Sequence, residues 1–256
     1  MRASGGVKRL RHSRTNWVLA AIALCCLLVS VASPQIAFGA HYFRKFFQVN
    51  TSPLDHVLTQ MDGAAKTFRT AQATLTADQY TKVVDEKETQ KGKVYFERRG
   101  NEVSMAADIT EPDKEYALYA DGKAQIYHPK IDQVDQYQPG KSKAQIEAFL
   151  LLGFGGGGHA LLATYDVKYG GVEKVNGVDA AKLELTPKSA QLQNNISKIV
   201  LWIDPAKGIS VQMQMFFPGG DYRLTKYSDI QVNQKLPDNV FKLKTTGKTR
   251  FNSPQG

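Results

Sequence analysis

Two stretches of sequence decide the fold: SKIVLWI (Ser197–Ile203) and VQMQMFF (Val211–Phe217). Both follow a period of two, and Pro205 and Gly208 mark a turn between them. Because successive residues of a strand point to opposite faces, each stretch can present one face to an interior and the other to water. The two stretches therefore predict strands of a sheet with one buried face.

The same pattern recurs outward from these stretches, from about Arg69 to Leu243. Asp121-Gly122 is a strong signal for a two-residue hairpin turn. Many short strands joined by tight turns usually close into a barrel or a sandwich. We expect about eleven strands, mostly antiparallel, at residues 70–84, 91–98, 102–109, 115–120, 123–128, 131–137, 165–169, 178–186, 197–204, 209–217 and 222–232.

Two helices interrupt this β pattern. Residues 54–68 carry apolar side chains three and four apart, after a Ser52-Pro53 start signal. Residues 141–152 predict a second helix, followed by the glycine run Gly153–Gly158. The run lacks the Lys-Ser/Thr of a phosphate-binding loop. Successive glycines fix no conformation, so the run is either a hinge for the second helix or a flexible surface loop.

The N-terminal 40 residues predict a signal peptide. A basic segment without acidic residues precedes an apolar core at Trp17–Val31, and small residues at 30–32 and 37–39 offer cleavage sites. The alternative is an uncleaved anchor that tethers the protein to the inner membrane. Either way we expect export. We then expect a linker at residues 41–53, one domain at residues 54–244 and a polar tail at residues 245–256.

Composition argues against several classes of function. The leader holds five of the 33 Lys and Arg and none of the 24 Asp and Glu, so the net charge of +9 falls to +4 after Ala40. No basic stripe remains there, which argues against nucleic acid as a partner. Cys25 and Cys26 both lie in the leader, which leaves no thiol for the rest of the chain. Scattered histidines and solvated acid pairs suggest no metal site, no cofactor and no enzyme; an exported hydrolase is the weakest alternative.

Three stretches resemble the LolA/LolB-like outer-membrane lipoprotein carriers of Gram-negative bacteria. They are GKVYFER (Gly92–Arg98), YADGKAQIYHP (Tyr119–Pro129) and LELTPK (Leu183–Lys188), and the similarity in their order covers roughly residues 54–244. The resemblance implies a fold that is mainly β with helices (α+β). It would be an incomplete antiparallel β-barrel of about eleven strands, with an α-helical lid over its concave face.

The family resemblance also implies a role for Arg98. In the family, an arginine at the end of the second strand hydrogen-bonds the lid and helps to hold the empty cavity shut. The matching position here is Arg98, but Arg99 replaces the family's following proline, so either arginine could be this lid latch. Without the resemblance, both would be ordinary charged residues of a turn.

We expect an acyl-binding cavity formed by the sheet and the lid. Methionines suit its walls because they adapt to irregular ligands. Period-two strands do not by themselves decide which face lines such a cavity, since a one-residue shift of register exchanges the faces. The residues that we expect to line the cavity and lid are Val94, Phe96, Met105, Leu118, Ile126, Ile146, Phe149, Leu150, Leu201, Met213 and Met215.

These features predict a monomeric periplasmic carrier that ferries lipoprotein acyl chains from the inner towards the outer membrane. Its partners would be lipoprotein acyl chains or another lipid, an inner-membrane donor complex and an outer-membrane acceptor. The alternative keeps the fold but makes the protein a lipid-sensing or protein-binding adaptor of the RseB type. An uncleaved N-terminal segment would favour this alternative, because a shuttle must diffuse.

Overall fold

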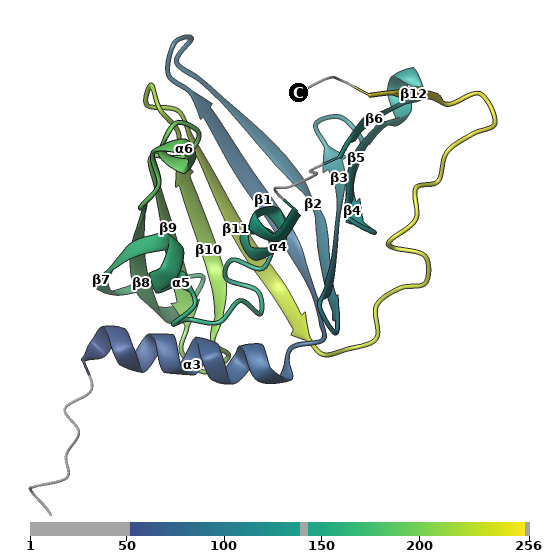
Figure 1. Ribbon diagram of the computed structural model, residues 1–256. Helices are drawn as coiled ribbons and strands as arrows, with labels where there is room; N and C mark the ends of the chain where they lie inside the picture. Colours follow the sequence, from purple (N-terminus) through teal and green to yellow (C-terminus); the bar gives the residue numbers. More distant parts are fainter. Residues whose placement is uncertain (1–51, 139–142, 254–256) are drawn as a thin grey trace, which may run out of the picture. The chain divides into compact units, whose positions relative to one another are not determined.

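The computed structural model describes residues 52–138 and 143–253 (Figure 1). The predicted signal peptide or anchor, and all of the linker before Ser52, lie outside the described residues. In the described residues, the chain is mainly β with a few helices, as predicted. None of the helices in these residues is both long and apolar enough to cross a membrane.

The first helix, α3 (Pro53–Thr67), confirms the helix expected at residues 54–68. The hydroxyl of Ser52 accepts a hydrogen bond from the backbone N–H of Asp55 at 3.2 Å and so caps the helix. Val57, Leu58 and Met61 lie on one face of α3 and are buried. Both the start of the helix and its buried face therefore follow from signals that are visible in the sequence, namely the cap and the apolar spacing.

Within residues 52–138 and 143–253, twelve strands form one open sheet. From edge to edge their order is β12-β6-β5-β4-β3-β2-β1-β11-β10-β9-β8-β7, and only the β12–β6 pair is parallel. The strands are β1 (Thr70–Thr81), β2 (Glu86–Arg99), β3 (Glu102–Glu111), β4 (Glu115–Ala120), β5 (Lys123–His128), β6 (Gln133–Tyr137), β7 (Tyr165–Val175), β8 (Val178–Pro187), β9 (Lys198–Asp204), β10 (Ile209–Phe216), β11 (Tyr222–Val232) and β12 (Arg250–Asn252).

The eleven predicted strands are all present, and β12 adds a twelfth. Asp121 and Gly122 both have positive φ angles, as a two-residue hairpin turn requires. The β1–β2 hairpin is longer than expected, because β2 begins at Glu86, ahead of the strand predicted at residues 91–98. Glu86 pairs with Thr81, so exposed charged residues extend the hairpin beyond the core.

One face of the sheet, which we call the inner face, carries most of the core. Phe96 of β2 lies opposite Ala71 of β1 and Met105 of β3. On the other half of the sheet, Leu201 of β9 lies opposite Met213 of β10. Buried side chains on this face form two clusters, and Met213 packs against both. The β1–β11 pair joins the two halves of the sheet, and with them the two clusters.

Three short α-helices and one 3-10 turn complete the described fold. They are η1 (Pro129–Ile131), α4 (Lys143–Leu150), α5 (Leu161–Thr164) and α6 (Ala190–Gln193). In Figure 1, α4 lies within the curve of the sheet and α3 crosses one end of it. The segment of the second predicted helix before Lys143 lies in the gap between the described ranges.

The fold continues beyond Lys244, where the sequence suggested only a polar tail. Residues 233–249, the C-terminal strap, pack apolar side chains against Tyr95, Ala106 and Leu118 on the outer face of the sheet. The carboxylate of Asp132 accepts hydrogen bonds from the hydroxyls of Thr246 and Thr249, both at 2.6 Å. These contacts position β12 beside β6, and the strap is the yellow segment of Figure 1.

Candidate ligand-binding site

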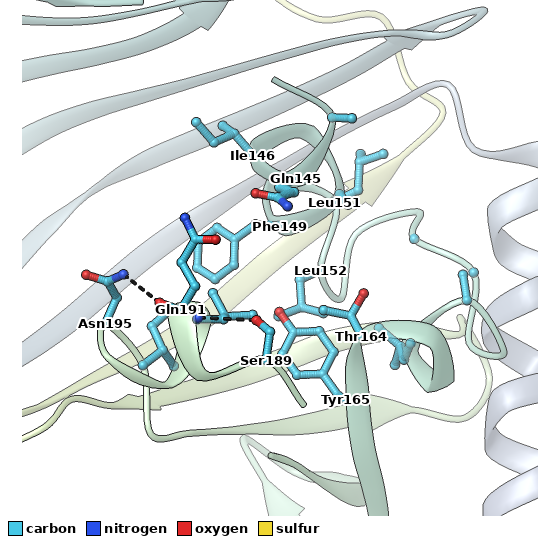
Figure 2. A pocket seen from close by; sticks show the side chains of 18 of the residues that line it. Gln145, Ile146, Phe149, Leu151, Leu152, Thr164, Tyr165, Ser189, Gln191 and Asn195 are labelled. Carbon is cyan, nitrogen blue, oxygen red and sulfur yellow. Dashed lines mark hydrogen bonds between the residues drawn. The ribbon is translucent and has the colours of Figure 1, made fainter. Parts of the chain in front are cut away.

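A cavity of about 760 Å³ lies among α4, α5, α6 and the loop that follows α4 (Figure 2). Its volume is within the range of small-molecule sites in proteins. The residues that line it come mostly from these helices and the loop, with few from the sheet. They are Arg98, Ala144, Gln145, Ile146, Ala148, Phe149, Leu151, Leu152, Gly156, Gly157, Ala160, Leu161, Thr164, Tyr165, Ser189, Gln191, Leu192, Asn195 and Ile196.

The lining is mainly apolar, with neutral polar residues contributed by α4, by α5 and by the segment around α6. Side chains such as Ile146, Phe149 and Leu152 face the cavity in Figure 2. The polar lining residues around α6 are partly engaged with their own backbone, since Asn195 Nδ2 donates to the carbonyl of Gln191 at 3.1 Å. Arg98 is the charged residue of the lining. This composition suits an apolar ligand with a polar end.

The loop at residues 151–158, which we call the inner loop, covers the inner face of the sheet. Phe154 is only 1% exposed. Its ring stacks on Phe96 with centroids 4.7 Å apart and meets Tyr227 edge-on at 4.8 Å. We call this arrangement the closed state. The interpretation of the glycine run as a flexible surface loop is wrong, because the run is packed into the core; its role as a hinge stays a prediction.

Close packing explains why glycines occupy this loop. A Cβ atom on Gly158 would lie 2.3 Å from the carbonyl oxygen of Leu58, in the backbone of α3. Gly155 has a φ of +82°, and a Cβ there would lie 2.4 Å from Cγ of Phe68. The glycines thus allow the inner loop to approach α3 and its C-terminal Phe68 more closely than other residues could.

Arg98 joins the inner loop to α3. Its guanidinium donates to the carbonyl of Gly155 at 2.5 Å and to the carbonyl of Ala65 at 3.2 Å. It also lies 5.6 Å from the ring centroid of Phe68. Burial, and secondarily the charge of Arg69, lowers the pKa of Arg98. The contacts match the geometry that a lid latch needs, and the latch role itself stays a prediction.

Arg99 points elsewhere. Its side chain is 78% exposed and forms an ion pair with Glu97 at 3.0 Å. In the closed state, Arg98 is therefore the one of the two arginines that contacts the inner loop and α3. The sequence alone left both candidates open, because either could end strand β2.

We predict that Arg98→Met weakens the closed state. Methionine keeps the apolar stem but removes the donors, which leaves the carbonyls of Gly155 and Ala65 without these partners. Hydrogen bonds to charged groups contribute about 1.5–3 kcal/mol, so urea unfolding should show a loss of that order. Arg99→Met is the matched control and should change the unfolding free energy by less than about 0.5 kcal/mol. Equal losses in the two variants would contradict a special role for Arg98.

Helix α4 is held loosely on the sheet. None of its residues, Lys143–Leu150, is fully buried. The hydroxyl of Tyr119 on β4 donates to Glu147 Oε1 at 3.1 Å. Burial and the nearby carboxylate of Glu147 raise the pKa of Tyr119 to about 12. A helix with few buried contacts opens at low free-energy cost, which is the property that a lid requires.

The structure divides the sequence-predicted cavity residues among different places. Ile146, Phe149 and Arg98 line the cavity. A second group belongs to the two inner-face clusters next to the inner loop or α4: Val94, Phe96, Met105, Leu150, Leu201, Met213 and Met215. Ile126 on β5 pairs with Ala117, which is linked through Ala107 on β3 to Val94 on β2. Ile126 therefore lies on the same inner face as Val94, where it is half-buried.

Leu118 requires a correction. It lies opposite Ala106 and packs with Tyr95 on the outer face, beneath the C-terminal strap. The strand period is two, so Leu118 points away from the face that Val94 and Phe96 occupy. We therefore remove it from the residues expected to line a cavity. The sequence did not predict a role for Phe154 or for the α6 segment. For Phe154, the available signal was that it is the one aromatic residue within the glycine run.

Comparison with known proteins places the chain in a family. Residues 67–244 match the family described as outer membrane lipoprotein carrier protein LolA, and the chain belongs to this family. This confirms the resemblance and the fold class that the sequence predicted. A comparison with curated proteins gave no significant match.

Solved structures with a similar fold include three from different bacteria. An uncharacterized conserved protein from Thermus thermophilus is 11% identical, with a TM-score of 0.51, and the match covers 79% of this chain and 100% of that one. The MucA/MucB complex of Pseudomonas aeruginosa is 14% identical, with a TM-score of 0.46, and the match covers 75% of this chain and 61% of that one. LolA superfamily protein NE2245 from Nitrosomonas europaea is 16% identical, with a TM-score of 0.38, and the match covers 73% of this chain and 96% of that one. The match thus spans less than two thirds of the length of the MucB structures.

Proposed function

We propose that this protein is a periplasmic carrier that binds lipoprotein acyl chains and ferries them from the inner towards the outer membrane. The observation that carries the proposal is the largely apolar cavity of about 760 Å³ beside a loop that covers an apolar sheet face. An acyl chain resists transfer through water because each exposed CH₂ costs about 0.8 kcal/mol. Hiding about ten such groups would supply roughly 8 kcal/mol by the same figure.

The closed state supports a two-step mode of binding. The cavity among α4, α5 and α6 would receive the first part of the chain, beside Ile146 and Phe149. Displacement of the inner loop would then expose Phe96 and Tyr227, which Phe154 covers in the closed state. Met213 packs against both clusters and can adapt to an irregular ligand. No bond of the ligand breaks in this scheme, so the function requires no catalytic group and no cofactor.

The energetics also allow release. The contacts that hold the inner loop must be recovered when the ligand leaves, and they include the stacked Phe154 and the two Arg98 hydrogen bonds. The apparent binding free energy of a ligand is then weaker than its intrinsic value by the free-energy cost of displacing the inner loop. A carrier needs this balance, because it must give its ligand to an acceptor.

Native mass spectrometry of the mature domain, purified gently from its host's periplasm, tests the proposal. We expect an added mass that resolves on denaturation to a lipoprotein or another acylated molecule. A clean apo mass, together with no shift on addition of palmitoyl probes, would contradict the carrier and favour a protein-binding adaptor of the RseB type.

A pair of variants locates the binding. Phe149→Ser removes an apolar side chain from the cavity wall and should weaken binding of a palmitoyl probe by about tenfold or more, since burial of a phenylalanine contributes about 1.5–3 kcal/mol. Tyr169→Ser changes an exposed aromatic on the edge strand β7 and should leave binding unchanged. Equal affinities in the two variants would place the ligand outside this cavity.

A further inference from the structure

His159 joins the wall of the cavity to α3 through two carboxylates. It follows Gly158 directly and precedes Ala160 and Leu161, which line the cavity. Its Nδ1 lies 2.5 Å from Asp62 Oδ2, and its Nε2 lies 3.1 Å from Asp55 Oδ1. Its backbone N–H donates to Asp62 Oδ1 at 3.2 Å. We call His159, Asp55 and Asp62 the His159 clamp.

The geometry of the clamp fits a doubly protonated imidazole ring. Both ring nitrogens face carboxylate oxygens. An ionised carboxylate has no proton to donate, so it acts only as a hydrogen-bond acceptor. A neutral imidazole carries one N–H, so one of the two aspartates would then face a nitrogen lone pair. Both contacts are favourable only in the imidazolium form. Asp55 and Asp62 are seven residues apart on α3, which is about two helical turns and brings both to the side that His159 approaches.

We propose that His159 is a positioning residue whose protonation fastens the inner loop and α5 to α3, and that its deprotonation promotes opening of the cavity. The clamp acts at the same junction as Arg98, but on the other side of the glycine run, next to Gly157 and Gly158. Its effect on ligand loading rests on the proposed function. Its effect on the closed state does not.

The charges around the clamp come from few elements. Asp55 and Asp62 face the imidazole from α3, and His56 on the same helix bonds Gln60 instead. On the other side of α5, the ammonium of Lys188 donates to the carbonyl of Leu162 at 2.6 Å. The hydrogen bonds to Asp62 and Asp55 raise the pKa of His159 above its ordinary value of 6.5. Burial opposes ionisation of Asp62, but the hydrogen bonds from His159 outweigh it and lower the pKa of this carboxyl.

The sign of the pH dependence follows from these directions. The closed state favours protonated His159, so the clamp stabilises it fully below pH 6.5. This stabilisation is lost as the pH rises through the raised pKa of the closed state. Opening should therefore become easier above pH 6.5, and the apparent affinity for an acyl ligand should rise with it. His159 is about 43% exposed, so the change should be modest, roughly two- to fivefold.

Hydrogen exchange of the ligand-free protein tests the clamp directly. After correction for the intrinsic pH dependence of exchange, amides of residues 151–164 should exchange roughly two- to fivefold faster at about pH 9 than at about pH 5.5. His159→Gln should abolish this step, and Asp62→Asn should reduce it. His128→Gln is the matched control, because His128 also lies between two carboxylates, Glu115 at 3.5 Å and Asp135 at 3.4 Å, but on β5. The control should keep the step.

Palmitoyl-probe binding across the same pH range separates the clamp from the proposed function. A pH step in exchange and in affinity, both lost in His159→Gln, would support the clamp and the carrier together. A step in exchange without any probe binding would support the clamp and contradict the carrier. Probe binding without a His159-dependent step, or a step that His128→Gln also removes, would overturn the clamp and leave the carrier in place.

Discussion

Phe154→Ala should lower the free energy of unfolding by about 3–5 kcal/mol and, at the same time, strengthen binding of acyl ligands. Phe154 is 1% exposed, between the rings of Phe96 and Tyr227, so truncation leaves a cavity against both. The loss falls on the closed state, because the inner loop is the element that carries this ring. Less free energy is then needed to displace the loop. Urea unfolding and a palmitoyl-probe titration measure the two effects.

Leu118→Ala is the matched control for this variant. Leu118 is also buried, at 6% exposure, but it packs on the outer face beneath the C-terminal strap. It should lose about 2–5 kcal/mol of stability, a typical cost for a buried leucine, with no gain in affinity. If Phe154→Ala weakens binding while Leu118→Ala leaves it unchanged, the inner loop is a permanent wall of the site. A displaceable cover would then be the wrong description.

Gly158→Ala should destabilise the protein although it adds only one methyl group. The new Cβ would lie 2.3 Å from the carbonyl oxygen of Leu58 and 2.5 Å from its Cα. These are backbone atoms of α3, so neither can move aside as a side chain can, and the inner loop or the helix must shift. We expect a loss of about 3 kcal/mol, at the upper end for overpacking, together with faster hydrogen exchange in residues 151–158.

Gly63→Ala gives a control with the opposite sign. Gly63 lies inside α3, and a Cβ there would meet nothing within 4 Å. Alanine is preferred over glycine within a helix by about 1 kcal/mol, so this variant should be more stable than the native protein. A similar loss in both variants would mean that α3 tolerates no change at all. The close approach of the inner loop would then not be the cause at Gly158.

Local signals predicted the elements of this fold well. The start of α3 depends on Ser52 and Pro53, and one hairpin on Asp121-Gly122; these interactions are short-range and therefore visible in the sequence. The short strand β12 was missed because it depends on hydrogen bonds from Thr246 and Thr249 to Asp132, 114 and 117 residues away in the chain. No local pattern marks such a strand.

The candidate site was predicted less completely, for two physical reasons. Strand periodicity cannot choose between the faces of a sheet, which is why Leu118 was grouped with residues of the inner face. A glycine run carries no apolar pattern of its own, so only tertiary packing shows that Gly155 and Gly158 bring Phe154 into the core. Ile146 and Phe149, which line the cavity, were found because they follow a helical spacing, which does appear in the sequence.

The most direct test is residue-resolved hydrogen exchange with and without a saturating palmitoyl probe. In the closed state, the N–H of Ser210 donates to the carbonyl of Gly153 at 2.7 Å, and the N–H groups of Phe154 and Gly156 donate to that of Leu151 at 2.9 Å. Entry of an acyl chain under the inner loop should break the Ser210–Gly153 bond, which joins the loop to β10, and loosen the two turns at Leu151 within the loop. Exchange at the three amides should therefore accelerate, while Ser197, bonded to Phe216 at 2.8 Å, stays protected. Unchanged or slower exchange at all three amides would contradict the displacement of the loop.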